Sequence, residues 1–192
     1  MKKTLLAISL ALFSSLAMAH PGHAEHGAWA GFLHPFTGID HLLVMIAIGM
    51  WAAKLGGSAR WQLPVTFVLV MAIGAAIGMS GLIPAGMSAE RVEIGVSVSV
   101  LAMGLLLLIQ LPLMRPIQIG LTAVFAMLHG FAHGLELSFS TGWSVMLGML
   151  AATALLHAIG LLLSSGRLTI AKQLNMLMGG LMLLTGVYLL AA

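Results

Sequence analysis

The stretch FLHPFTGIDHLLVMIAIGMWAAKL (Phe32–Leu55) places ionisable side chains at the start of a long apolar run. His34, Asp40 and His41 lie in its first half, and the remainder is apolar almost to its end. A run of this length is typical of a membrane-spanning helix, in which charge and imidazole are energetically costly. The stretch therefore predicts a span, over about Phe36–Ala53, whose polar residues serve a function.

The composition of the whole chain agrees with a membrane protein. Of its 192 residues, 60% are hydrophobic and 7% are charged, and the mean hydropathy is +1.10. Soluble domains carry about 25% charged residues. The chain has no cysteine, which excludes disulfides and thiolate metal sites. It also lacks the G-x-x-x-x-G-K-[ST] motif of a phosphate-binding loop, so we expect no ATP-driven mechanism and no ATPase partner.

The first nineteen residues resemble a secretory signal peptide. Lys2 and Lys3 precede a short apolar run, Leu5–Leu16, and Ala17–Ala19 reads Ala-Met-Ala, which matches a cleavage site. An uncleaved first helix is the alternative. Cleavage would leave His20 as the mature N-terminus and lower the net charge from +3 to +1, a balance that favours no nucleic-acid partner.

The remaining apolar segments predict an all-α integral membrane protein, a bundle of six transmembrane helices. A span needs about 20 apolar residues. We expect a signal peptide over 1–19, a periplasmic histidine-containing segment over 20–33 and the membrane domain over 34–192. The six expected spans are about Phe36–Ala53, Leu63–Ile83, Val92–Leu113, Pro116–Leu137, Gly142–Ser164 and Leu168–Leu190.

The basic residues between these spans predict an orientation. With the N-terminus outside, the inner loops carry five basic residues and the outer side carries Arg91, next to Glu90 and Glu93. This asymmetry follows the positive-inside rule. We therefore expect a multi-pass protein of the bacterial inner membrane with both termini in the periplasm. The inner basic residues are Lys54, Arg60, Arg115, Arg167 and Lys172.

Polar residues of the first and fourth spans fall at similar depth, near the outer face. The fourth span carries His129, His133 and Glu136, which share one narrow helical face at 100° per residue. His129 and His133 form an i, i+4 pair, a common way for a helix to offer two imidazoles to one metal ion. Together with the first-span residues they predict a metal site. The candidate ligands are His34, Asp40, His41, His129, His133 and Glu136. Asp40 either binds the ion directly or orients a neighbouring ligand.

Four other histidines have two interpretations each. His157 is alone in an apolar stretch of the fifth span, nearer the inner face, where it is either a relay ligand on an exit path or a packed core residue. His20, His23 and His26 follow the expected cleavage site and either capture a metal ion outside the membrane or belong to a flexible tail.

The chemistry of the candidate ligands narrows the choice of metal ion. Imidazole and carboxylate suit Zn²⁺, Ni²⁺, Co²⁺ and Fe²⁺, whereas Cu⁺ prefers sulfur and Mg²⁺ and Ca²⁺ prefer oxygen. The residue types do not choose among the first four, and Zn²⁺ can occupy such a site. They also leave open an integral-membrane zinc-dependent hydrolase using the same His/Asp cluster, and a bis-histidine haem protein.

Two motifs resemble one known family. HPFTGIDH (34–41) is similar to the H-P-x-x-G-x-D-H signature of HupE/UreJ nickel/cobalt permeases, and HGFAHGLE (129–136) resembles that family's second histidine motif. The resemblance covers the whole chain. It implies a permease rather than an enzyme, with Ni²⁺ or Co²⁺ as substrate and no prosthetic group. By this resemblance the six candidate ligands carry the ion from the periplasm into the cytoplasm. It leaves homo-oligomerisation open.

Overall fold

The computed structural model describes residues 27–82, 86–109, 111–137, 142–166 and 169–191. Within these ranges all regular elements are helices, as the composition predicted. The expected signal peptide and the N-terminal histidines His20, His23 and His26 lie outside the described residues. The helices are α2 (Ala28–Leu33), η2 (His34–Phe36), α3 (Ile39–Leu55), α4 (Ala59–Met79), α5 (Ala89–Leu108), α6 (Arg115–Glu136), α7 (Gly142–Leu163) and α8 (Ala171–Ala191).

Five of the described helices, α4 to α8, are long and apolar enough to cross a membrane. A sixth span results if the segment Ala28–Phe36 and helix α3 count as one element, bent by 85°. Large apolar side chains such as Leu69, Leu147 and Leu184 are exposed on the outside of these helices, as a lipid-facing surface requires. The chain is therefore a multi-pass membrane protein.

Several boundaries differ from the sequence prediction by up to five residues; α5, for example, is Ala89–Leu108 rather than Val92–Leu113. Helix α3 begins at Ile39 rather than Phe36, because Thr37 and Gly38 form the turn that follows η2. Helix α4 begins at Ala59 rather than Leu63. Its first turn contains Arg60 and other polar residues, which a hydropathy criterion excludes although they continue the helix.

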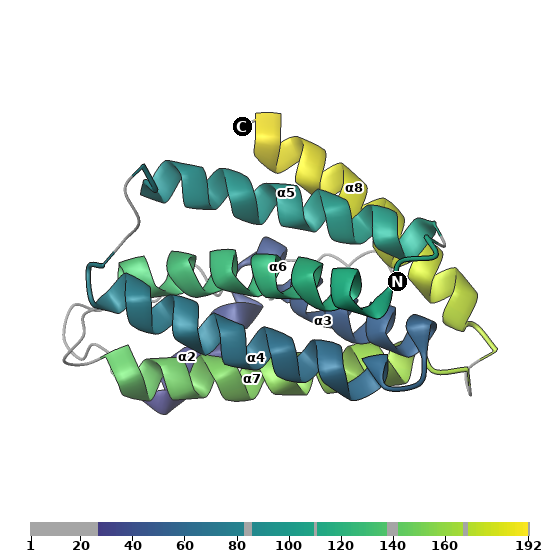
Figure 1. Cartoon of the computed structure of the whole chain (residues 1–192), viewed down its shortest axis with the longest axis horizontal. Helices are drawn as coiled ribbons and strands as arrows, with labels where there is room; N and C mark the ends of the chain where they lie inside the picture. Colours follow the sequence, from purple (N-terminus) through teal and green to yellow (C-terminus); the bar gives the residue numbers. More distant parts are fainter. Residues whose placement is uncertain (1–26, 83–85, 110, 138–141, 167–168, 192) are drawn as a thin grey trace, which may run out of the picture.

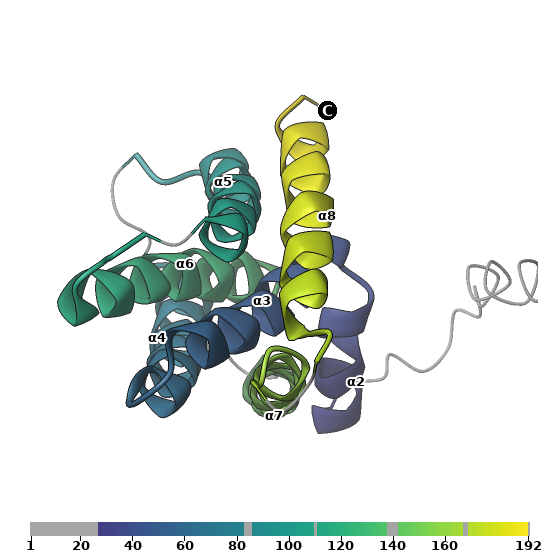
Figure 2. The ribbon, with the colours of Figure 1, turned by 90° about the vertical axis from the view of Figure 1, so that its right-hand side faces the viewer.

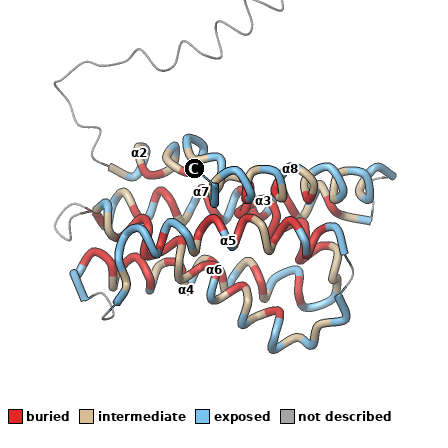
Figure 3. Tube along the Cα trace, turned by 90° about the horizontal axis from the view of Figure 1, so that it is seen from above, coloured by how far each residue is buried: buried red, intermediate tan, exposed pale blue. Residues whose placement is uncertain are grey.

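Helix α3 is the central element of the bundle. Figures 1 and 2 show it enclosed by other helices, and it packs against α4, α5, α7 and α8. All residues from Leu43 to Ala53 are buried except Ile46. A helix that is apolar all round is expected in such a position. By contrast, α8 crosses the bundle obliquely (Figure 2), and Figure 3 shows most of its residues as exposed or intermediate.

Close glycine contacts join α4 to α6. A Cβ atom added at Gly130 would lie 2.4 Å from the carbonyl oxygen of Met71, and one at Gly134 would lie 2.5 Å from that of Ala75. The glycines of α4 face the same contact, since an added Cβ at Gly78 would lie 2.9 Å from the Cα of Gly134. Such small-residue pairs let transmembrane helices approach closely. The contact fixes α6, and with it His129 and His133, against α4.

Lys54 joins the end of α3 to the end of α5. Its ammonium group donates to the carbonyl oxygens of Leu106, Leu107 and Ile109 at 3.1, 2.8 and 2.9 Å. These carbonyls lie at the end of α5, where no following helical turn supplies N–H groups to donate to them. A cation at a helix C-terminus also interacts favourably with the helix dipole.

We therefore expect Lys54→Met to lower the free energy of unfolding by about 1–2 kcal/mol, because it keeps the apolar stem and removes the charged donor. Thermal unfolding in detergent micelles measures this loss. Lys172→Met is the matched control, since Lys172 is exposed in the first turn of α8. Equal unfolding temperatures for the two variants would contradict the capping role of Lys54.

Candidate metal centre

The segment between η2 and α3 turns the chain so that His34 and His41 come from two differently directed helices. Pro35 occupies the first turn of η2, where its missing N–H costs nothing, and its side chain is buried. The Thr37 hydroxyl donates to the carbonyl oxygen of His34 at 2.7 Å, and its backbone N–H donates to the same oxygen at 2.9 Å. These contacts stabilise the 85° bend.

Asp40 and His41 form a pair at the start of α3. The Asp40 Oδ1 atom lies 2.9 Å from both the backbone nitrogen and the Nδ1 atom of His41. A carboxylate accepts, so His41 carries its proton on Nδ1 and leaves the lone pair of Nε2 free. The same arrangement orients many metal-binding histidines.

The position of Gly38, between the two histidines of this motif, requires a small residue. A Cβ atom there would lie 3.0 Å from Asp40 Oδ1 and 3.2 Å from His41 Nδ1, closer than ordinary van der Waals contact. Its φ of −96° is open to any residue, so the requirement is for space rather than for backbone conformation. The Gly38 position thus allows Asp40 and His41 to pair.

On α6, His129 and His133 are both buried. The Nδ1 atom of His129 lies 2.9 Å from the carbonyl oxygen of Phe125, one turn earlier. A carbonyl accepts only, so Nδ1 of His129 is the protonated nitrogen and its Nε2 carries the lone pair. In both helices a hydrogen bond on one side of the ring therefore directs an unprotonated nitrogen into the space between them.

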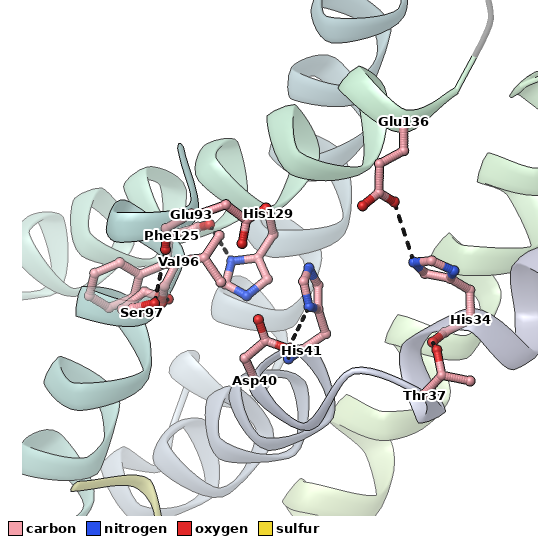
Figure 4. Close-up of polar contacts among 11 residues, drawn as sticks. His34, Thr37, Asp40, His41, Glu93, Val96, Ser97, Phe125, His129 and Glu136 are labelled. Atoms are coloured by element: carbon pink, nitrogen blue, oxygen red, sulfur yellow. Dashed lines mark hydrogen bonds and ion pairs between the residues drawn. The ribbon is translucent and has the colours of Figure 1, made fainter. Parts of the chain in front are cut away.

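The imidazoles of α3, α6 and η2 meet in that space. The His41 ring centroid lies 4.9 Å from that of His129 and 4.4 Å from that of His133. The His133 centroid also lies 5.0 Å from that of His34. Figure 4 shows His129 facing Asp40 and His41, with His34 and Glu136 as a neighbouring group. His133 therefore contacts both groups.

The outer group could hold an ion with little rearrangement. One donor atom from each of His34, His133 and Glu136 lies within 4.8 Å of the other two. Ligand atoms around one tetrahedral ion are separated by about 3.4 Å. The His34 Nε2 and Glu136 Oε2 atoms are already 3.7 Å apart. Modest side-chain rotation would bring these donors to coordination distance.

Exposure falls steadily from this outer group into the bundle. The side chains of Glu136 and His34 are 58% and 40% exposed, and those of Asp40 and His41 are 18% and 14% exposed. His129 is fully buried. The cluster is therefore open to solvent at one end of the bundle and dry at its deeper end.

The buried nitrogens have no hydrogen-bond partner. Among the described residues, the Nε2 atoms of His41, His129, His133 and His157 are all buried and unpartnered. A buried polar group without a partner costs about 1–3 kcal/mol. Three of these atoms belong to one cluster, and an unprotonated imidazole nitrogen is the form that binds a metal ion. The donor set therefore fits a divalent transition-metal ion.

The structure brings together all six ligands predicted from the two motifs. Asp40 lies against His41, which favours an orienting role over direct coordination. His157 lies deeper, apart from these six residues, and contacts Phe67. The ring of Phe67 also lies against His129, with centroids 5.7 Å apart. The sequence did not single out Phe67, because it lies within an apolar run and gives no local signal.

Fold and site together define a helical multi-pass membrane protein with a cluster of imidazoles and carboxylates that is exposed at one end of the bundle and buried in its interior. The family profile described as HupE / UreJ protein matches residues 8–189. Protein HupE of Rhizobium leguminosarum bv. viciae is 38% identical over 189 residues, covering 97% of this chain and 95% of that protein. No solved structure matches the chain. The chain belongs to the HupE/UreJ family.

Proposed function

We propose that this protein carries Ni²⁺ or Co²⁺ across the bacterial inner membrane, from periplasm to cytoplasm, through the cluster between α3 and α6. One observation supports this above the others. The buried, unpartnered Nε2 atoms of His41, His129 and His133 lie next to the exposed pair of His34 and Glu136. Such atoms are costly in a purely structural core, and a passing cation satisfies them.

The residues take distinct roles in this proposal. His34 and Glu136 at the exposed mouth take the ion from water, and His133 passes it to the deeper pair. Asp40 holds the His41 ring and supplies negative charge beside it. His41 and His129 then bind the partly dehydrated ion. Binding needs neutral imidazoles and ionised carboxylates, so protons compete with the metal.

The driving force in this proposal is electrical. With both termini outside, the path runs inward, and the membrane potential favours entry of a cation. Two positive charges gain about 4.6 kcal/mol at 100 mV. No ATP-binding loop occurs in the sequence, so the proposal requires no nucleotide. The N-terminal histidines remain a prediction for ion capture.

A zinc-dependent membrane hydrolase would use the same residue types. It would also need an open position on the metal facing a cleft for substrate. His129 and His133 are instead enclosed by helices, with exposed fractions of 0% and 1%. Family membership and this enclosure favour transport.

Uptake of radioactive nickel and cobalt by cells expressing the chain tests the proposal. We expect accumulation of one or both ions at low concentration, and loss of that accumulation in the His41→Ala/His133→Ala double variant. Zinc as competitor measures how well the site excludes a similar ion. A membrane-inserted protein without accumulation of either ion would reject transport and favour the hydrolase.

A further inference from the structure

His157 has the features of a metal ligand but lies apart from the six candidate ligands described above, which we call the outer cluster. Its Nδ1 atom lies 2.6 Å from the carbonyl oxygen of Met45 on α3, so that nitrogen carries the proton. Its Nε2 atom is buried and unpartnered. The ring is thus held in the same tautomer as His129, with its lone pair directed into the bundle.

Three further donor atoms lie on the helices around it. Thr153 precedes His157 by one turn of α7 and lies on the same helical face. Its hydroxyl donates to the thioether sulfur of Met45 at 3.3 Å and approaches that of Met71 at 3.7 Å. Thr153, Met45 and Met71 are all fully buried. Hydroxyl and thioether groups from α3, α4 and α7 therefore converge one turn from His157.

A single aromatic ring connects this group to the outer cluster. The Phe67 centroid lies 5.7 Å from that of His129 and 5.0 Å from that of His157, which it meets edge-on. His129 lies seven residues from the end of α6 and His157 lies fifteen residues from the start of α7, at the same end of the bundle. Counted in residues from that end, His157 therefore lies deeper in the bundle than His129.

We infer that His157, Thr153, Met45 and Met71 form a second position for the transported ion, deeper than the outer cluster at His157, with the ring of Phe67 between His129 and His157. The inference rests on the proposed transport function. Displacement of Phe67 lets the ion move from the His129 Nε2 atom to the His157 Nε2 atom.

The donor atoms of this deeper position suit brief, weak binding of the transported ion. Thioethers and imidazole favour transition-metal ions over Mg²⁺ and Ca²⁺. The described donors include no carboxylate, so the deeper position binds a divalent ion more weakly than the outer one. An ion that must leave again needs such a weak second position. His157 also lines an apolar cavity of about 380 Å³ between α4 and α7.

Nickel binding to the purified full chain tests the inference without any transport. By equilibrium dialysis we expect His157→Gln, whose amide can still donate to the Met45 carbonyl, to bind one nickel ion fewer per chain than the unaltered protein. In the His41→Ala/His133→Ala background, X-ray absorption of the remaining nickel should show sulfur neighbours. Met45→Leu/Met71→Leu, which conserves volume, should remove them. An unchanged number of bound ions in His157→Gln, or no sulfur signal in that background, would overturn the deeper position.

Uptake separates this inference from the proposed function. Nickel that has entered the cell is the fraction that an external chelator does not remove. We expect His157→Gln to lower this fraction at least tenfold, while nickel still binds the outer cluster. Entry at the unaltered rate would overturn the relay and leave transport standing. Absence of uptake by the unaltered chain would instead reject transport, and the dialysis result would still decide whether the deeper position exists.

Discussion

Replacing Gly130 by valine is expected to remove most folded protein from the membrane. The added Cβ would lie 2.4 Å from the carbonyl oxygen of Met71 and 2.9 Å from the backbone nitrogen of Ala75. Both neighbours are backbone atoms of α4, so no side-chain rotation relieves the contact and the helices must separate. We expect a loss of about 3 kcal/mol or more in the free energy of unfolding, the upper end for overpacking.

Gly120→Val is the matched control for this substitution. Gly120 is on the same helix, and an added Cβ there meets no atom within 4 Å. Membrane yield and thermal unfolding in detergent should therefore fall for the Gly130 variant and stay near the original values for the Gly120 variant. Equal loss in both would mean that helix propensity, rather than the contact between α4 and α6, explains the effect.

The same contact shows what sequence patterns can predict about the fold. Hydropathy located the spans within a few residues, since α6 is Arg115–Glu136 against an expected Pro116–Leu137. Gly74 and Gly78, like Gly130 and Gly134, have the four-residue spacing that is typical of closely packed transmembrane helices. The spacing does not predict which helices these glycine pairs bring into contact, because that depends on the tertiary structure. The structure packs one pair on the other.

Helix α2 and the bend after it were not predicted. Its six residues, AWAGFL, are too few to show helical periodicity. Their helical form depends on α7, where an added Cβ at Gly31 would meet the carbonyl oxygen of Val145. A helix stabilised by tertiary contacts leaves little local signal. The bend matters because it brings His34 over the end of α6.

The sequence predicted which residues belong to the candidate site, but not which of them contact one another. Helical angles placed His129, His133 and Glu136 on one face. They could not show that His133 would contact both His34 and His41, since that depends on how η2 and α3 approach α6. For Asp40 the sequence left two roles open, direct binding or orientation of a neighbouring ligand, and the structure places its carboxylate 2.9 Å from the Nδ1 atom of His41.

His133 should therefore be the most sensitive single position of the cluster. Its ring lies 5.0 Å from that of His34 and 4.4 Å from that of His41, which makes it the contact between the exposed mouth and the buried pair. We expect His133→Ala to lower nickel or cobalt uptake by about a hundredfold or more, since even partners that only orient a ligand contribute 10–100-fold. Initial rates of radiometal uptake, normalised to the amount of protein in the membrane, measure the loss.

Two comparisons separate loss of a ligand from loss of packing. Thr122→Val, at a buried polar position of the same helix whose hydroxyl donates to the Gln118 carbonyl oxygen within α6, should keep most of the uptake. His34→Gln should raise the ion concentration needed for half-maximal uptake and keep much of the maximal rate, because water still reaches the mouth there. If His34→Gln and His133→Ala lowered the maximal rate equally, the graded path from mouth to interior would be wrong. The cluster would then act as one site in which every ligand counts alike.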